Sequence, residues 1–185
     1  MTFFENVPDN FGSNQGMLLE YLLERLKVNS WPIRITDLPS QSALVGGCIR
    51  DAFLDRLPDK PDLDFVVRNQ SIELVRNLAR KFKGTLVILD QERDIARLVL
   101  DGWTLDFASQ AGENLEDDLL RRDFRLNAIA LKLDAELELF DPNGGIKDIG
   151  KQTIVAITEN NLIDDPLRIL RGYRFAAELN FSLEK

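Results

Sequence analysis

The sequence predicts an α+β protein in which a mostly antiparallel or mixed sheet carries helices segregated on one face. Short apolar strand patterns alternate with helical patterns along the chain, and the pair Asp101-Gly102 between two apolar runs is a strong signal for a β-hairpin. The chain has no repeats and no low-complexity tracts. With 185 residues and a hydrophobic fraction of 44%, it is expected to form one domain and the start of a second.

The first half of the chain is expected to alternate helices and strands. In the segment after the turn LPDKP, alternation sends Leu63 and Phe65 to one face of a strand, and Asp62, Asp64 and Val66 to the other. The elements expected in this half are a helix over 17–27, a strand over 42–47, a helix over 48–56, a turn over 57–61, a strand over 62–67 and a helix over 71–82.

The second half is expected to begin with the predicted hairpin and to end in a helix. Because the chain stops directly after that helix, we expect it to be part of a longer protein. The elements expected in this half are strands over 85–89, 96–100 and 103–107, a loop over 108–116, a helix over 122–132, a strand over 136–140, a turn over 141–145 and a helix from about 164 to 179.

Composition excludes several classes of function. No run of 18 apolar residues is present, so no membrane span is expected, and the start MTFFENVPDN lacks the pattern of an export signal. The single cysteine, Cys48, rules out an internal disulfide framework, is expected to be a small buried residue, and suits a cytoplasmic protein. The sequence contains no histidine, which excludes Ser-His triads and His-based metal sites. Any metal must therefore be a hard ion held by carboxylates.

The net charge of −8 argues against a broad surface that grips nucleic acid. An acidic enzyme can still use RNA if its basic residues cluster at one cleft or if another region holds the RNA. The charge therefore leaves a nucleotide site open.

A glycine pair lies between a predicted strand and a predicted helix. Gly46 and Gly47 would let a phosphate approach the backbone at the start of the helix. Arg50 could add a charge-assisted bond to a phosphate oxygen, and Asp51 follows it. A tight turn with a surface Arg-Asp pair explains the same residues equally well.

Three aspartates fall on neighbouring strands of the predicted sheet. Asp62 and Asp64 project to the same face, where they repel each other unless a cation lies between them. A two-metal phosphoryl-transfer site uses such a pair to hold ions about 3.5–4 Å apart, and Asp106 could supply the third ligand. A solvated strand face is the alternative for all three.

Together these features resemble the nucleotidyltransferase superfamily with a DNA polymerase β-like palm. More closely, the chain resembles the class II group of tRNA CCA-adding enzymes and bacterial poly(A) polymerases. The similarity spans about residues 42–179 and lies in four segments: LVGGCIRDAFLDRLPDKPDLDFVV, DLLRRDFRLNAIAL, DPNGGIKDI and DDPLRILRGYRFAAEL. It implies a palm-like sheet in a catalytic head over 1–150, followed over 151–185 by the first helices of an all-α neck that is truncated.

The resemblance also implies a role for each site residue. Asp62, Asp64 and Asp106 would be catalytic and bind two Mg²⁺ ions. Nucleotide binding would fall to Gly46, Gly47, Arg50 and Asp51 at the triphosphate, to Arg122, Asp123 and Asn127 at the sugar and phosphates, and to Asp165, Arg168 and Arg171 on the last helix.

The residues of the last helix suit recognition of a base. An Asp acceptor beside an Arg donor fork matches the Watson–Crick edge of C or A. Ordinary alternatives exist, because Asp165 before Pro166 is typical of a helix start, and Arg168 and Arg171 could lie on a solvated helix face. Arg122 and Asp123 could likewise be a surface pair that opens a helix.

The implied activity is the addition of CMP and/or AMP from CTP or ATP to a tRNA 3′ end. The tRNA would be gripped mainly by regions outside this chain, so the chain alone could be inactive, and no DNA partner is expected. A poly(A) polymerase and a non-catalytic nucleotide- or RNA-binding module are the alternatives. Ten residues, 108–117, separate Phe107 from Asp118, and this short link predicts addition of C alone because no long loop is present to switch the pocket from C to A.

Overall fold

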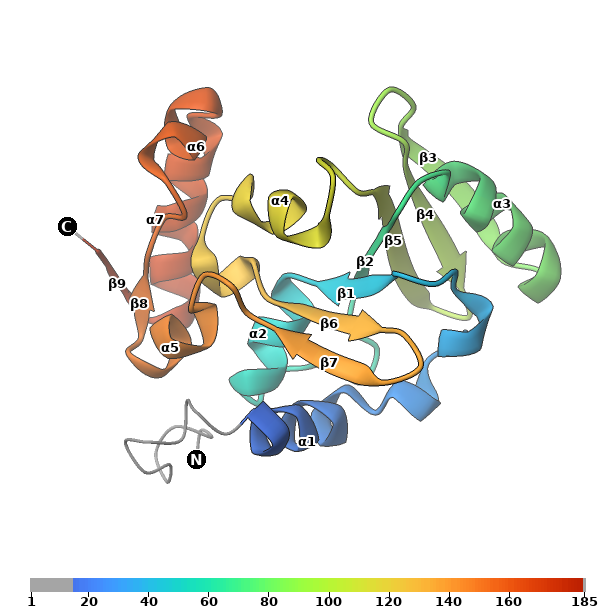
Figure 1. Cartoon of the computed structure of the whole chain (residues 1–185), viewed down its shortest axis with the longest axis horizontal. Coiled ribbons are helices and arrows are strands. Elements are labelled where there is room, and N and C mark those ends of the chain that lie inside the picture. The colour runs from blue at the N-terminus through green and yellow to red at the C-terminus, as the bar shows by residue number, and fades with distance from the viewer. Residues whose placement is uncertain (1–14, 185) are drawn as a thin grey trace.

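A computed structural model describes residues 15–184, which form one large mixed sheet flanked by helices (Figure 1). The expectation about an export signal concerns residues that lie outside this range. The strand order is β3-β4-β5-β2-β1-β6-β7, and every neighbouring pair is antiparallel except β2 and β5, which run parallel. The strands are β1 (Ala43–Val45), β2 (Leu63–Val67), β3 (Thr85–Asp90), β4 (Ile95–Leu100), β5 (Trp103–Ser109), β6 (Ala130–Leu133) and β7 (Leu137–Phe140).

The helices gather at the ends and faces of this sheet. Among residues 15–184, no helix is long and apolar enough to cross a membrane. The α-helices are α1 (Gln15–Leu26), α2 (Gly47–Phe53), α3 (Ser71–Phe82), α4 (Leu115–Leu120), α5 (Gly145–Gly150), α6 (Glu159–Asp164) and α7 (Leu167–Leu179). Short 3₁₀ turns are η3 (Val28–Ser30), η4 (Ile35–Asp37) and η5 (Arg125–Asn127), and a separate two-stranded sheet joins β8 (Thr153–Ile154) to β9 (Ser182–Leu183).

The main core lies between one face of the large sheet and helices α1, α2 and α3. Leu63 and Phe65 of β2 are buried there, and the Phe65 ring stacks on Phe107 of β5 with 4.9 Å between centroids. The predicted alternation along this strand is therefore confirmed. The opposite face carries a smaller buried cluster that includes Val66 and Leu119, the latter from α4.

The helix predicted over 122–132 is wrong. The chain turns through η5 and then forms β6, in which Leu131 lies opposite Leu44 of β1. The backbone N–H of Arg125 donates to the Val155 carbonyl, outside any helix, at 3.0 Å. The run NAIALKL is apolar enough for either structure, and pairing with a buried central strand overrides its helical pattern.

Three helices, α4, α5 and α6, were not predicted. Helix α4 begins inside the expected loop because Asn114 caps it, accepting a bond from the Asp117 N–H at 3.0 Å. Helix α5 follows the expected turn because the Asp141 carboxylate accepts the N–H groups of Gly145 and Ile146. The helix predicted from about 164 to 179 is α7, which begins at Leu167 directly after Pro166, and α6 precedes it as a separate helix.

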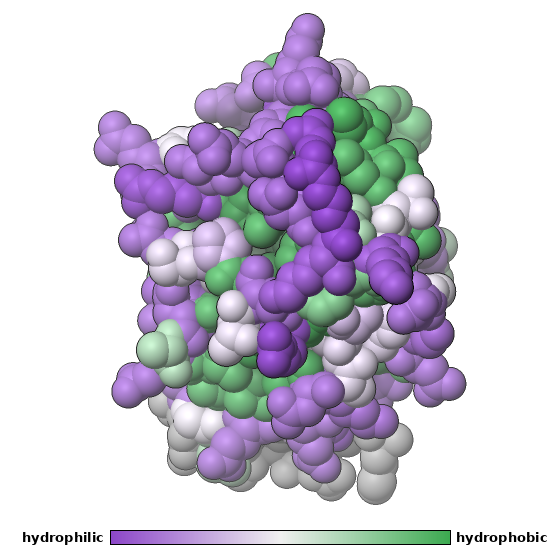
Figure 2. Space-filling view, turned by 90° about the vertical axis from the view of Figure 1, so that its right-hand side faces the viewer, coloured by the Kyte–Doolittle hydropathy of each residue, from purple (hydrophilic) through white to green (hydrophobic). Residues whose placement is uncertain are grey.

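Strand β3 forms one edge of the sheet. Figure 2 shows the molecule from the side of β3, β4 and α3, where apolar surface lies between polar side chains. Val87, Ile88 and Leu89 of β3 are exposed large apolar residues at this edge.

Gly145 allows α5 to approach the η5 turn closely. A methyl group at this position would overlap the Arg125 carbonyl and lie 2.9 Å from the Ile129 side chain.

We expect Gly145→Ala to lower the free energy of unfolding by about 1–3 kcal/mol, measured by urea denaturation. The control is Gly144→Asn, at a left-handed position with φ 74° that asparagine tolerates and where an added Cβ atom meets nothing within 4 Å. Equal losses in the two variants would contradict the close packing.

Candidate active site

A cleft of about 610 Å³ opens between the β1–α2 turn, β2, the segment before β6, and α7. Every predicted site residue except Asp106 lines it. These residues are Gly46, Gly47, Arg50, Asp51, Asp62, Asp64, Arg122, Asp123, Asn127, Asp165, Arg168 and Arg171. Residues more than a hundred positions apart in the sequence thus share one cavity.

The glycine turn forms one wall of the cleft. Gly46 has φ 80°, a conformation that side chains disfavour, and its N–H donates to the Ile129 carbonyl at 3.1 Å. A Cβ atom here would lie 3.5 Å from Nη1 of Arg122 and 3.8 Å from a carboxylate oxygen of Asp64. The turn is therefore both geometrically suited to glycine and close to the predicted catalytic carboxylate.

Arg50 is part of the site and not of a surface pair. Its side chain donates two bonds to the Asp51 carboxylate, both at 2.9 Å, and one to Oδ1 of Asn127 at 2.7 Å. Arg50 is only 8% exposed, so its guanidinium has little contact with bulk water. Asn127 in turn donates to Asp123 at 3.4 Å, so a chain of hydrogen bonds connects Arg50 to the RRDF segment, residues 121–124.

Three arginines surround the ring of Phe175. Their guanidinium carbons lie 5.2 Å (Arg50), 5.7 Å (Arg171) and 4.9 Å (Arg174) from the ring centroid. The buried ring packs edge-on against Phe124, with 6.0 Å between centroids. Cation–π contact therefore holds positive charge at this wall of the cleft.

Arg174 and Phe175 line the cleft but were not predicted as site residues from the sequence. Arg174 follows Arg171 by three positions, and residues at this spacing share a helix face, so the signal was present in the sequence. Phe175 looks like an ordinary core residue in the sequence. Its second role depends on Arg50, which comes from a distant segment.

Asp123 anchors the last helix to the RRDF segment. One of its oxygens accepts the Phe124 N–H at 2.8 Å, and the other accepts Nε of Arg171 at 2.8 Å. Asp123 is buried, and no α-helix begins at this position. The alternative, in which Arg122 and Asp123 form a surface pair at the start of a helix, is therefore wrong.

Arg122 is positioned by a carboxylate that the sequence analysis also missed. Asp118 is fully buried and accepts Nη2 of Arg122 at 3.0 Å, Nη2 of Arg121 at 3.1 Å and the Ala111 N–H at 3.1 Å. Burial alone would raise the pKa of Asp118, but Arg122 and the other donors outweigh it and lower the pKa. The residue is therefore ionised, and it directs Arg122 toward the glycine turn.

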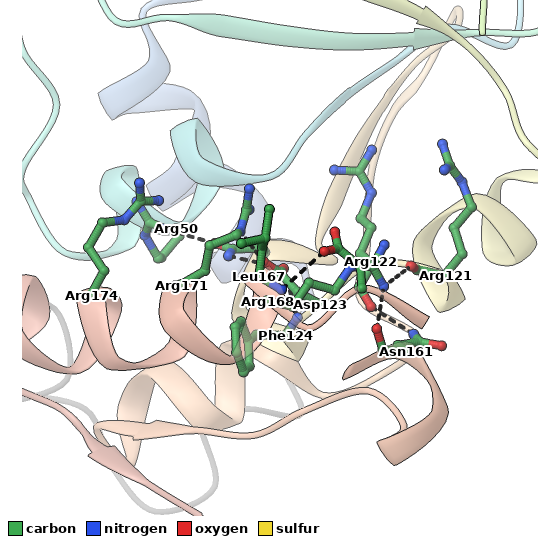
Figure 3. Close-up of polar contacts among 12 residues, drawn as sticks. Arg50, Arg121, Arg122, Asp123, Phe124, Asn161, Leu167, Arg168, Arg171 and Arg174 are labelled. Carbon is green, nitrogen blue, oxygen red and sulfur yellow. Dashed lines mark hydrogen bonds and ion pairs between the residues drawn. The ribbon is translucent and has the colours of Figure 1, made fainter. Parts of the chain in front are cut away.

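Arg168 is held by backbone as well as by Asp165. Its Nη1 donates to the carbonyls of Arg121 at 2.9 Å and Asn161 at 3.1 Å (Figure 3), and its Nε lies 3.6 Å from an Asp165 oxygen. Asp165 also accepts the Leu167 N–H at 3.1 Å, as expected for a residue at a helix start. The two interpretations of Asp165 are therefore compatible.

The sheet brings two of the three predicted carboxylates side by side. Asp64 and Asp106 are directly paired in the parallel register of β2 and β5, while Asp62 precedes β2 and is exposed. Burial, and then the charge of Asp106, raise the pKa of Asp64 from its ordinary 3.8 to about 6. A nearby cation would relieve both effects, so this pair of oxygen donors fits a hard ion such as Mg²⁺.

The three carboxylates do not form a ready ligand cluster. In the described part of the chain, no group of three or more Asp, Glu, Cys or His side chains is arranged to hold one metal ion. Asp106 is instead bonded through both oxygens to Arg97, at 2.7 and 2.9 Å. The sequence analysis did not anticipate this ion pair.

Comparison with known proteins assigns the family. Residues 42–155, more than half of the chain, match the family described as Poly A polymerase head domain. The chain belongs to this family. Its similarity to nucleotidyltransferases, predicted from the four sequence segments, is thereby confirmed.

Named relatives of this head domain include tRNA nucleotidyltransferases. The chain is 44% identical over 153 residues to the CC-adding tRNA nucleotidyltransferase of Synechocystis sp., covering 83% of this chain and 36% of the relative. It is 36% identical over 158 residues to the A-adding tRNA nucleotidyltransferase of Aquifex aeolicus, covering 77% and 19%. It spans about a third of the length of the CC-adding relatives it matches.

A solved structure confirms the head-domain fold. The complex of a CCA-adding enzyme with CTP superposes with a TM-score of 0.77 at 30% identity and covers 91% of this chain and 43% of that one. The predicted α+β class with a mixed sheet is therefore correct.

The raised pKa of Asp64 predicts a pH-dependent stability. Because the folded state binds this proton more tightly than the unfolded chain, ionisation between about pH 4 and 6 lowers the free energy of unfolding. We expect Asp64→Asn to be more stable than the wild type by about 1–3 kcal/mol at pH 7.5, in buffer with EDTA, and by much less at pH 4.5.

Urea denaturation at the two pH values measures this difference. The control is Asp59→Asn, at an exposed turn residue, which should change stability little at either pH. A stabilisation by Asp64→Asn that is independent of pH would contradict the proposed cost of ionising Asp64.

Proposed function

We propose that the chain is the catalytic head of a template-independent tRNA nucleotidyltransferase, which adds CMP and/or AMP from CTP or ATP to a tRNA 3′ end. The observation that carries the proposal is the cleft that gathers a glycine turn, a cluster of arginines of which Arg50 is buried, and the carboxylate of Asp64. Relatives whose names include CC-adding and A-adding tRNA nucleotidyltransferases support it.

The arginines that line the cleft would bind the phosphates. Arg50 and Arg122 lie beside the glycine turn, and Arg171 and Arg174 come from α7, where they share the Phe175 ring with Arg50. Because bonds to fixed acidic partners already orient Arg50, Arg122 and Arg171, little reorganisation is needed when a triphosphate binds. The Gly46 backbone leaves room for a phosphate to approach.

Asp62, Asp64 and Asp106 would hold two Mg²⁺ ions. When bound, such ions neutralise the triphosphate and lower the pKa of an attacking hydroxyl. The chain would align the RNA 3′-OH with the α-phosphate for in-line attack, with no covalent enzyme intermediate. The sequence contains no histidine, and this mechanism requires none.

Asp165 and Arg168 would select the base. An acceptor and a donor fork on one helix match the edge of C or A and leave the wrong base with unpaired groups. The two carbonyls that hold Arg168 support this role, because a fixed donor discriminates better than a mobile one.

The link between β5 and α4 favours addition of C alone. Only residues 110–114 separate the two elements. The N–H groups of Glu113 and Asn114 donate to Asp117, and that of Ala111 donates to Asp118. A short segment bonded in this way is poorly suited to move and change the shape of the nucleotide pocket. The 44% identity to a CC-adding relative supports the same specificity.

The division of the chain into a head over 1–150 and the start of a helical neck over 151–185 is part of the proposal. The family match ends at residue 155, and β8 and β9 form a small sheet apart from the large one. The buried single cysteine supports a cytoplasmic location.

The products of the reaction test the function. We expect the chain to bind CTP in calorimetry when Mg²⁺ is present and much more weakly in EDTA. Fused to the C-terminal region of the Synechocystis relative, it should extend tRNA lacking CCA, with CTP and ATP both supplied, to products ending in CC.

Other products would select among the alternatives. Products ending in CCA would contradict the specificity inferred from the short link, and long A tracts would favour a poly(A) polymerase. Nucleotide binding without dependence on Mg²⁺ and without extension would favour a non-catalytic module.

Substitution of Arg168 tests base selection. We expect Arg168→Ala to reduce the preference for CTP over UTP by about 1–3 kcal/mol while the affinity for inorganic triphosphate changes little, because Arg168 is assigned to the base. Competition calorimetry measures both quantities. Arg50→Ala should show the opposite pattern, and an unchanged base preference in Arg168→Ala would overturn the assignment.

A further inference from the structure

Arg97 lies directly beside the proposed catalytic carboxylate. It faces Asp106 across the antiparallel pair of β4 and β5. Its Nε donates to Oδ1 at 2.7 Å and its Nη2 to Oδ2 at 2.9 Å, so both carboxylate oxygens are bonded in the planar fork geometry of an Arg–carboxylate pair. The guanidinium therefore fixes the plane of the Asp106 carboxylate.

Arg97 also lies in the field of all three proposed metal ligands. The charges of Asp106, Asp62 and Asp64 all act on the Arg97 guanidinium, which donates its hydrogen bonds to Asp106. A metal ion at Asp106 would share the carboxylate oxygens with the Arg97 N–H groups and would lie near a fixed positive charge. Both effects oppose the binding of a cation.

We propose that Arg97 is a positioning residue of the metal site, which orients the Asp106 carboxylate and weakens the hold of Asp106 on a divalent cation. This inference rests on the proposed function, because it takes Asp106 to be a metal ligand. Arg97 would thus tune the affinity of the site for a divalent cation, although it lies outside the cleft and outside the four segments that resemble the family.

A second ion pair on the same hairpin offers a matched control. Arg93 lies 3.8 Å from Asp90 at the turn between β3 and β4, and its side chain is 78% exposed, compared with 40% for Arg97. Replacing either arginine removes the same charge from the chain. Only the replacement of Arg97 frees Asp106.

Titration of the whole chain with Mn²⁺, followed by the electron paramagnetic resonance of the free ion, tests the proposal. We expect Arg97→Gln to bind Mn²⁺ about three- to fivefold more tightly than the wild type. The interaction energy of a half-exposed ion pair corresponds to a change of about this size in a dissociation constant. Arg97→Lys, which keeps the charge but loses the fork, should lie between them. Arg93→Gln should match the wild type, and circular dichroism checks that each variant is folded.

A double-mutant cycle with Asp106→Asn separates the possible results. Asp106→Asn should weaken Mn²⁺ binding, and Arg97→Gln should give no gain in that background. A gain that persists without Asp106 would mean that Arg97 acts only through its general charge, and unchanged or weaker binding by Arg97→Gln would exclude competition. Either result would overturn the proposal and leave the proposed function intact. If Asp106→Asn binds Mn²⁺ as the wild type does, both this proposal and the metal assignment of Asp106 are wrong.

Discussion

The parallel pairing of β2 with β5 is the constraint on which the rest of the site depends. It places Asp64 beside Asp106 on one face of the sheet, while on the other face Phe65 stacks on Phe107 in the main core. A slip of one residue in β2 would bury Asp64 in that core and expose Phe65. Apolar packing on one face thus holds the Asp64 and Asp106 carboxylates close together on the other face. A metal ion bound between them would relieve their repulsion.

Charge compensation explains how an acidic chain holds a cluster of arginines in one cleft. Arg50 is bonded to Asp51, Arg171 to Asp123, and Arg122 to Asp118, which is fully buried. Each carboxylate orients its partner, and the Phe175 ring makes cation–π contacts with Arg50 and Arg171. Many of the acidic residues near the cleft therefore serve to position positive charge. A net charge of −8 and a phosphate site are compatible for this reason.

Much of the fold and the composition of the cleft could be predicted from local patterns. Strand β2 and helix α3 follow directly from alternation and from helical spacing, and the motif residues converge as expected. The helix predicted over 122–132 failed because strand pairing with β1 is invisible in a single sequence. Asp118 was missed although its partner Arg122 lies only four residues away, because the burial of the pair appears only in the folded chain. Arg97 was missed because the pairing of β4 with β5 brings Asp106 to it.

The rigidity of the residues proposed to select the base bears on how many kinds of nucleotide one pocket can accept. Moving Arg168 would break its bonds to the Arg121 and Asn161 carbonyls, at about 1 kcal/mol each. A pocket that changes from C to A must therefore gain about 2 kcal/mol from contacts made elsewhere during the change. The link over 110–114 is poorly suited to supply them, because the N–H groups of Ala111, Glu113 and Asn114 are already bonded to Asp117 and Asp118. Within the described residues, the geometry thus favours a pocket with one fixed pattern of donors and acceptors.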